Sequence, residues 1–200
     1  MANYAIPAKS LETEYEIKKS RFIARVAYAS DRASAMALLT QAKADYPDAR
    51  HHCWAYLLGN PQSASSAAMS DDGEPSGTAG KPILNVLQHK NVGDVMLIVI
   101  RYFGGIKLGA GGLVRAYSTA AQQAMEQLEI QEQVCTVDLL VFLEFSQEQL
   151  LRHWLSTHQG QVTSAEYGNC VRVRIAVPEM ELETFESFAL SQRWKLDVEK

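Results

Sequence analysis

The 200-residue sequence predicts an α+β fold built from two domains. Runs that alternate apolar and polar residues, as strands do, are interleaved with stretches whose apolar residues recur at helical spacing. Residues 135–200 give the order βαββαβ, and the polar segment Glu129–Gln133 separates them from the rest. With 47% hydrophobic and 21% charged residues, the chain has the composition of a globular protein. We therefore expect one domain over 1–132 and a second over 135–200.

The first domain is expected to begin with a β-hairpin, because residues 11–29 alternate in polarity. Ser30 and Asp31 can cap a helix that ends before Pro47. The run Val95–Ile100 is typical of a strand buried on both faces, at the centre of a sheet. The other expected elements are strands over 11–19, 21–29 and 51–58, a loop over 59–81, a helix over 82–89, a glycine-rich loop over 101–112 and a helix to about residue 128.

The second domain is expected to have a ferredoxin-like fold. The βαββαβ order predicts a four-stranded antiparallel sheet with two helices on one face. Gly168 and Asn169 supply the turn of the central hairpin. The expected elements are strands over 137–145, 161–167, 170–177 and 194–198, and helices over 147–158 and 178–190.

The net charge of −4 argues against a protein that binds nucleic acid over its whole surface. Residues 1–134 carry thirteen basic and thirteen acidic side chains, whereas residues 135–200 carry six and ten. Any contact with phosphate therefore belongs to the first domain. Three well-separated cysteines, without a C-x-x-C pair, indicate a reducing compartment. With no signal-peptide pattern and no long apolar run, we expect a cytoplasmic protein without a membrane partner.

The loop from Arg101 to Gly112 is the first candidate site. Glycines allow close approach to a ligand, and the amino terminus of the following helix offers unpaired N–H groups to an anion. Tyr102 and Phe103 can stack on bases or pack in the core. The alternative is a tight turn, and the dinucleotide fingerprint fails because Val114 stands at its third glycine position. The candidate anion- or nucleic-acid-binding residues are Lys81, Arg101, Tyr102, Gly104, Gly105, Lys107, Gly109, Gly111, Gly112 and Arg115.

A second candidate region combines an acidic turn with a pair of histidines. The carboxylates of Asp71, Asp72 and Glu74 can gather a cation, act as acid and base, or form local hydrogen bonds in a polar turn. His51 and His52 can line a cleft, but their side chains point to opposite faces of a strand and cannot share one metal ion. We assign no catalytic residue, no metal and no cofactor.

Three motifs together resemble the Impact family (YigZ-like, UPF0029) in its bacterial two-domain form. They are RHHC at 50–53, SDDGEPSGTAGKP at 70–82 and VIRYFGGIKLG at 99–109. The resemblance implies that the first domain has the fold of ribosomal protein S5 domain 2, and that the second is similar to a domain of elongation factor G (domain V). Eukaryotic relatives restrain a translation kinase partly through an additional domain, so only the general link to translation carries over.

The sequence leaves three functions open. The first is a non-enzymatic protein that associates with RNA or the ribosome and regulates translation, for which a flat basic face would be the signature. The second is an enzyme or sensor for a small phosphorylated or carboxylated metabolite, for which a concave pocket joining the two candidate regions would be the signature. A protein partner bound by the ferredoxin-like sheet is a third reading. We expect a monomer or weak oligomer.

Overall fold

The computed structural model describes residues 3–198 and divides into two compact units. One unit is Tyr4–Gln133, and the other contains the chain from Val134 onward together with Asn3. Each unit has its own hydrophobic core. The protein is therefore α+β, with two separately packed parts.

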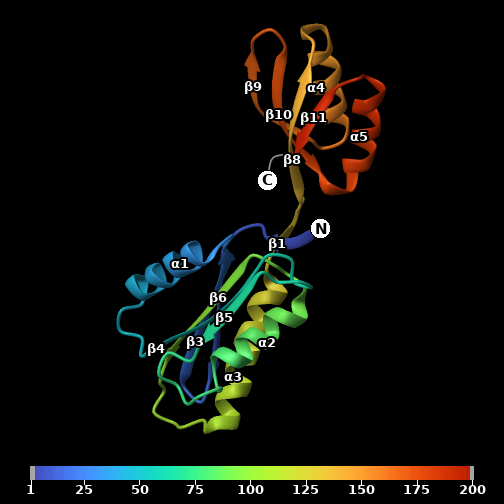
Figure 1. Ribbon diagram of the computed structural model, residues 1–200. Coiled ribbons are helices and arrows are strands. Elements are labelled where there is room, and N and C mark those ends of the chain that lie inside the picture. The colour runs from blue at the N-terminus through green and yellow to red at the C-terminus, as the bar shows by residue number, and fades with distance from the viewer. Residues whose placement is uncertain (1–2, 199–200) are drawn as a thin grey trace. The chain divides into compact units, whose positions relative to one another are not determined.

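The first unit is an antiparallel five-stranded sheet in the order β2-β3-β6-β4-β5 (Figure 1). Helices α2 and α3 cover one face of this sheet, and α1 covers the other. The elements are β1 Tyr4–Pro7, β2 Leu11–Ile17, β3 Ser20–Tyr28, α1 Arg32–Asp45, β4 His51–Leu58, β5 Ser66–Ser70, α2 Gly80–Lys90, β6 Val95–Tyr102, α3 Ala110–Gln127 and β7 Ile130–Gln133.

Strand β6 lies at the centre of the sheet, as its continuous apolar run predicts. Alternate side chains enter different cores: Leu97 and Val99 meet α2 and α3, whereas Ile98 and Ile100 meet the layer beneath α1. Helix α1 begins at the predicted cap, where the Asp31 carboxylate accepts the Ser34 N–H at 2.7 Å.

Two sequence predictions for this unit are wrong. The sequence predicts a polar link around 129–133, but Ile130–Gln133 forms β7, which pairs antiparallel with β1. It predicts a loop over 59–81, but Ser66–Ser70 forms β5 on the sheet edge beside β4. Both strands are short and partly exposed, so the apolar pattern that marks a buried strand is absent from them.

The second unit has the predicted ferredoxin-like topology. Its sheet order is β11-β8-β10-β9, with every pair antiparallel and with α4 and α5 packed against it (Figure 1). In β10, Val173 and Ile175 are buried, while Arg172 and Arg174, which alternate with them, are exposed. The elements are β8 Thr136–Leu143, α4 Glu148–Thr157, β9 Gln161–Tyr167, β10 Val171–Pro178, α5 Leu182–Ser191 and β11 Lys195–Val198, with single 3₁₀ turns η1 Phe145–Gln147 and η2 Glu179–Glu181 before the helices.

Between residues 3 and 198, no helix is long and apolar enough to cross a membrane.

Candidate functional site

A cavity of about 470 Å³ opens in the first unit where three segments meet. The start of β4 contributes Arg50 and His51, and the turn after β5 contributes Gly73–Pro75. The third wall comes from Arg101 at the end of β6, the following loop, and the start of α3 up to Leu113. The two regions that the sequence singled out thus border the same cavity, which lies within the size range of ligand pockets.

Asp71 builds the acidic turn rather than facing a ligand. Its carboxylate accepts the backbone N–H groups of Gly77, Ala79 and Gly80 at 2.8, 3.0 and 2.8 Å. Burial raises the pKa of Asp71, but these three hydrogen bonds outweigh it and lower the pKa below its usual value. With its oxygens engaged in this way, Asp71 is not arranged as a general base.

Asp72 fastens this turn to β4. Its carboxylate accepts the His52 N–H at 2.6 Å, and Lys43 lies 3.6 Å from the same group. The Asp72 carbonyl lies 2.8 Å from Nδ1 of His51, so the neutral ring donates from Nδ1 and keeps Nε2 as an acceptor. His51 is therefore held in one orientation at the cavity wall.

Glu74 and Arg101 form a buried ion pair beside the cavity. Glu74 Oε1 lies 2.5 Å from Arg101 Nη1, and their side chains are only 4% and 7% exposed. The Tyr117 hydroxyl also donates to Glu74 at 2.9 Å, and His51 Nε2 is 4.0 Å from the same oxygen. Arg101, a candidate anion-binding residue from the sequence, is thus already paired with Glu74. The pairing joins residues 27 positions apart, which sequence spacing alone does not reveal.

No activated nucleophile lies beneath this ion pair. Cys53 Sγ lies 2.9 Å from the Asp71 carbonyl and 3.3 Å from the Tyr117 hydroxyl. Burial raises the pKa of the Cys53 thiol to about 12 and also raises the pKa of Tyr117. Both groups keep their protons at neutral pH, whereas a nucleophilic cysteine requires a lowered pKa.

The cations free to meet a ligand are Arg50 and Lys107. Both are exposed, line the cavity, and form no ion pair with any residue from 3 to 198. The amino terminus of α3 lines the same cavity, with Gly109 as its cap at φ +71°, and no side chain among residues 3–198 caps its first turn. The sequence analysis does not include Arg50 among the candidate binding residues. The feature of the sequence that could have indicated it is its position directly before the histidine pair.

Two family models match this chain. Residues 18–125, more than half of the chain, match the family model for the Impact N-terminal domain. The chain belongs to the Impact family. Residues 141–189 match a second model, described as a domain of unknown function (DUF1949). The resemblance carried by the three sequence motifs is thereby confirmed.

Bacterial Impact proteins resemble the chain over nearly its full length. The IMPACT family member YigZ of Escherichia coli is 38% identical over 94% of this chain and 92% of its own, and an IMPACT family member of Haemophilus influenzae is 37% identical over 94% and 91%. A solved structure titled as a hypothetical protein has 36% identity and a TM-score of 0.77, covering 100% of this chain and 98% of its own. The two-part α+β fold is therefore that of the family.

Several predicted residues of the Impact N-terminal domain do not line the cavity. Tyr102 and His52 belong to the face covered by α1, where Arg21 lies over the Tyr102 ring and burial lowers the pKa of His52. Gly104 has a structural role, because a Cβ there would overlap the Lys19 backbone. The others outside the lining are Lys81, Gly105, Gly111, Gly112, Arg115, Asp71 and Asp72. Those inside it are His51, Glu74, Arg101, Lys107 and Gly109.

The acidic turn of the Impact N-terminal domain does not gather a metal site. Its three carboxylates point to different partners: backbone amides, the β4 backbone and Arg101. Across residues 3–198, no group of three or more His, Cys, Asp or Glu side chains is arranged to hold a metal ion.

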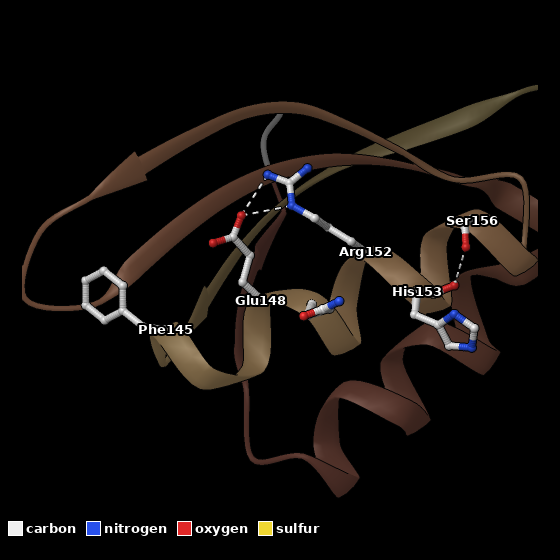
Figure 2. Close-up of a pocket in the computed structure, with 6 residues that line it drawn as sticks. Phe145, Glu148, Arg152, His153 and Ser156 are labelled. Atoms are coloured by element: carbon white, nitrogen blue, oxygen red, sulfur yellow. Dashed lines mark hydrogen bonds and ion pairs between the residues drawn. The ribbon is translucent and has the colours of Figure 1, made fainter.

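A second hollow, of about 590 Å³, lies on the unit that carries the DUF1949 match. Figure 2 shows that all its walls come from Phe145–Ser156, which is η1 and the exposed side of α4. Arg152 donates to Glu148 at 2.7 and 2.9 Å, so its charge is already compensated, and the His153 ring points away from both. The hollow is the outer surface of one helix rather than a cleft between elements.

Proposed function

We propose that this Impact-family protein is a non-enzymatic, RNA- or ribosome-associated regulator of translation, and that it contacts RNA through the cavity of its first unit. Membership of the family supports a link to translation. The observation that carries the RNA contact is the pair of unpartnered cations, Arg50 and Lys107, beside the uncapped start of α3. Neutralised phosphates supply most of the free energy of non-specific RNA binding.

An exposed aromatic ring supports RNA over other anionic polymers. Phe103 is 47% exposed, lines the same cavity, and has the Arg101 guanidinium 5.6 Å from its ring centre. Bases of single-stranded RNA stack on such rings, while nearby basic side chains meet the phosphate. Arg101 in this arrangement orients the Phe103 ring, whereas Arg50 and Lys107 make the ionic contacts with phosphate.

The protonation states beneath the cavity favour binding over catalysis. The raised pKa values of Cys53 and Tyr117 keep both groups neutral, and Glu74 is held by Arg101. A general base needs a pKa near the working pH and a lone pair free for substrate. In the cavity lining, His51 Nε2 offers such a lone pair.

The second candidate function is an enzyme or sensor for a small anionic metabolite in the same cavity. The observation that favours it is the concave shape, which joins the acidic turn to the start of α3 instead of presenting a flat basic face. A metabolite would be held by the same two cations. Binding of long RNA distinguishes the two functions, because it is expected for an RNA-associated protein and not for a metabolite enzyme or sensor.

The experiment is co-sedimentation of the full-length protein with ribosomes and with ribosomal RNA over a salt series. The test variant is Arg50→Ala/Lys107→Ala. The matched control is Arg32→Ala/Lys81→Ala, which removes the same two charges at exposed positions outside the cavity. We expect salt-sensitive binding that the test variant loses and the control keeps. No binding at low salt, or equal loss in both variants, would overturn the proposal.

A further inference from the structure

The shape of the cavity restricts which part of an RNA can enter it. A continuous RNA strand lies along an open groove, whereas this cavity is bounded by β4, the acidic turn and the 101–109 loop. Its volume of about 470 Å³ suits one small ligand. A nucleotide at the end of a strand, or a free one, fits such a space without bending the rest of the strand.

The charge of the lining suits a phosphate monoester. Arg50, Arg101 and Lys107 bring three positive charges and Glu74 one negative, so the lining has a net charge of +2 with His51 neutral. A monoester carries about −1.5 to −2 at neutral pH, whereas each internal phosphodiester carries only −1. The terminal phosphate therefore compensates the lining more completely than an internal one does.

The cavity wall contains both a buried donor and accessible ones. Arg101 is only 7% exposed through its side chain, and its Nε has no hydrogen-bond partner among residues 3–198. Buried guanidinium donors are normally satisfied, and the acceptor that Arg101 has, Glu74, engages Nη1. The uncapped first turn of α3 lines the cavity, and its backbone N–H groups are accessible donors there.

We propose that the cavity is a nucleotide-end site, which binds a nucleoside with a terminal 5′-phosphate: either the 5′-phosphorylated end of an RNA or a free nucleoside monophosphate. This inference rests on the proposed function for the RNA source only. The phosphate lies at the start of α3 between Arg50 and Lys107, and the base stacks on Phe103 beside Leu108. His51 Nε2 accepts a hydrogen bond from the ribose or base.

The test measures affinities of the full-length protein for short single-stranded RNAs of one sequence, with a 5′-phosphate or a 5′-hydroxyl. We expect at least about tenfold tighter binding of the phosphorylated RNA, in keeping with one additional charge-assisted contact. Equal affinities would overturn the nucleotide-end site but leave the RNA-binding proposal intact. Tight binding of the 5′-phosphorylated RNA without any binding of ribosomes would keep the nucleotide-end site and overturn the association with the ribosome.

Small ligands distinguish the two sources. Adenosine 5′-monophosphate, adenosine and inorganic phosphate are titrated by calorimetry, and the monophosphate is used to displace the phosphorylated RNA. If the free nucleotide binds as tightly as the RNA, the ligand is a free nucleoside monophosphate; if it binds more weakly but still displaces the RNA, the ligand is the RNA end. Failure of the monophosphate both to bind and to displace the RNA would contradict the site.

Two exposed substitutions test the placement of the ligand without removing a buried group. Phe103→Ala is expected to weaken nucleotide binding about tenfold and to leave inorganic phosphate unchanged, because only the base stacks on the ring. Lys107→Ala is expected to weaken both. The control is Arg32→Ala, which lies in α1 outside the cavity. Equal effects of Phe103→Ala on nucleotide and phosphate would show that the base does not lie on Phe103.

Discussion

At the scale of single residues, a chain of polar side chains runs beneath the cavity from Cys53 through Tyr117 and Glu74 to Arg101. Each member satisfies the next in a region shielded from water. Removing one member leaves its neighbour buried without a partner, which is more unfavourable than never having buried either. The buried residues of this chain therefore contribute to the stability of the first unit. Arg50 and Lys107, which are exposed, do not.

Glu74→Gln is expected to destabilise the first unit by about 3–5 kcal/mol, because it leaves the Arg101 charge buried without a counter-ion. Chemical denaturation followed by circular dichroism measures the change. Lys107→Ala, at an exposed position in the same cavity, is expected to change stability by no more than about 0.5 kcal/mol. Similar small effects of both substitutions would mean that the Glu74–Arg101 pair is not buried as described.

The raised pKa of Cys53 predicts a pH dependence of stability. The thiol titrates near 9 when unfolded and near 12 in the folded protein, so the unfolded state loses its proton first as pH rises. The stabilisation is complete below about pH 9 and is lost progressively up to about pH 12. Denaturation of wild type and Cys53→Ala across this range should give a steeper decline in the wild type, and identical slopes would contradict the assignment.

Thiol labelling checks the same residue directly. At about pH 8 we expect iodoacetamide to modify the exposed Cys170 and to leave Cys53 unmodified until the protein unfolds. Mass spectrometry of the peptides measures this. Labelling of Cys53 at the rate of Cys170 in folded protein would show an ionisable, accessible thiol, and would reopen the catalytic reading.

At the scale of elements, two glycines of one loop and helix have different roles. Gly104 passes so close to the β2–β3 turn that a Cβ would overlap the Lys19 backbone, whereas a Cβ at Gly111 in α3 would meet the end of the Arg115 side chain at 3.8 Å, an ordinary contact. The loop from Gly104 to Gly109 therefore has a fixed path over the hairpin. This path sets the place of Lys107 at the cavity.

Gly104→Ala is expected to destabilise the protein or displace the loop, and to weaken RNA binding by moving Lys107. Gly111→Ala is expected to be neutral or stabilising by up to about 1 kcal/mol, since alanine is the better helix former. Thermal melting and RNA affinity of both variants give the comparison. Equal behaviour of the two would contradict the close approach at Gly104.

The sequence predicts elements well where burial imposes a pattern. The predicted strand 51–58 coincides with β4, and the run Val95–Ile100 lies at the centre of the sheet. It predicts them poorly where pairing is non-local and exposed: β1 and β7 are four residues each and meet from opposite ends of the first unit. The site follows the same division. The turn and the loop are visible as motifs, but the Glu74–Arg101 pair is a tertiary contact.

At the scale of the whole molecule, charge and core are both divided between the two units. The acidic excess belongs to residues 135–200, while residues 1–134 balance their charges and contain the cavity. Separate cores mean that each unit buries its own apolar side chains. The first unit thus has what it needs to fold and to meet an anionic ligand by itself.

A fragment of residues 1–133 is expected to fold and to retain RNA binding within a factor of about three of the full chain, because all the cations of the cavity lie in it. Circular dichroism and fluorescence anisotropy with single-stranded RNA measure the two properties. A folded fragment without this affinity would place the RNA contact in the second unit.

The most direct test of the cavity as the RNA contact is the salt dependence of that anisotropy measurement on the full chain. On a single strand, each neutralised phosphate charge contributes roughly 0.7 to the slope of log affinity against log salt, so Arg50→Ala/Lys107→Ala, which removes two cations, should lower the magnitude of that slope by about 1.4. The Arg32→Ala/Lys81→Ala control should keep the wild-type slope. Slopes that agree between wild type and Arg50→Ala/Lys107→Ala would contradict RNA binding through the cavity.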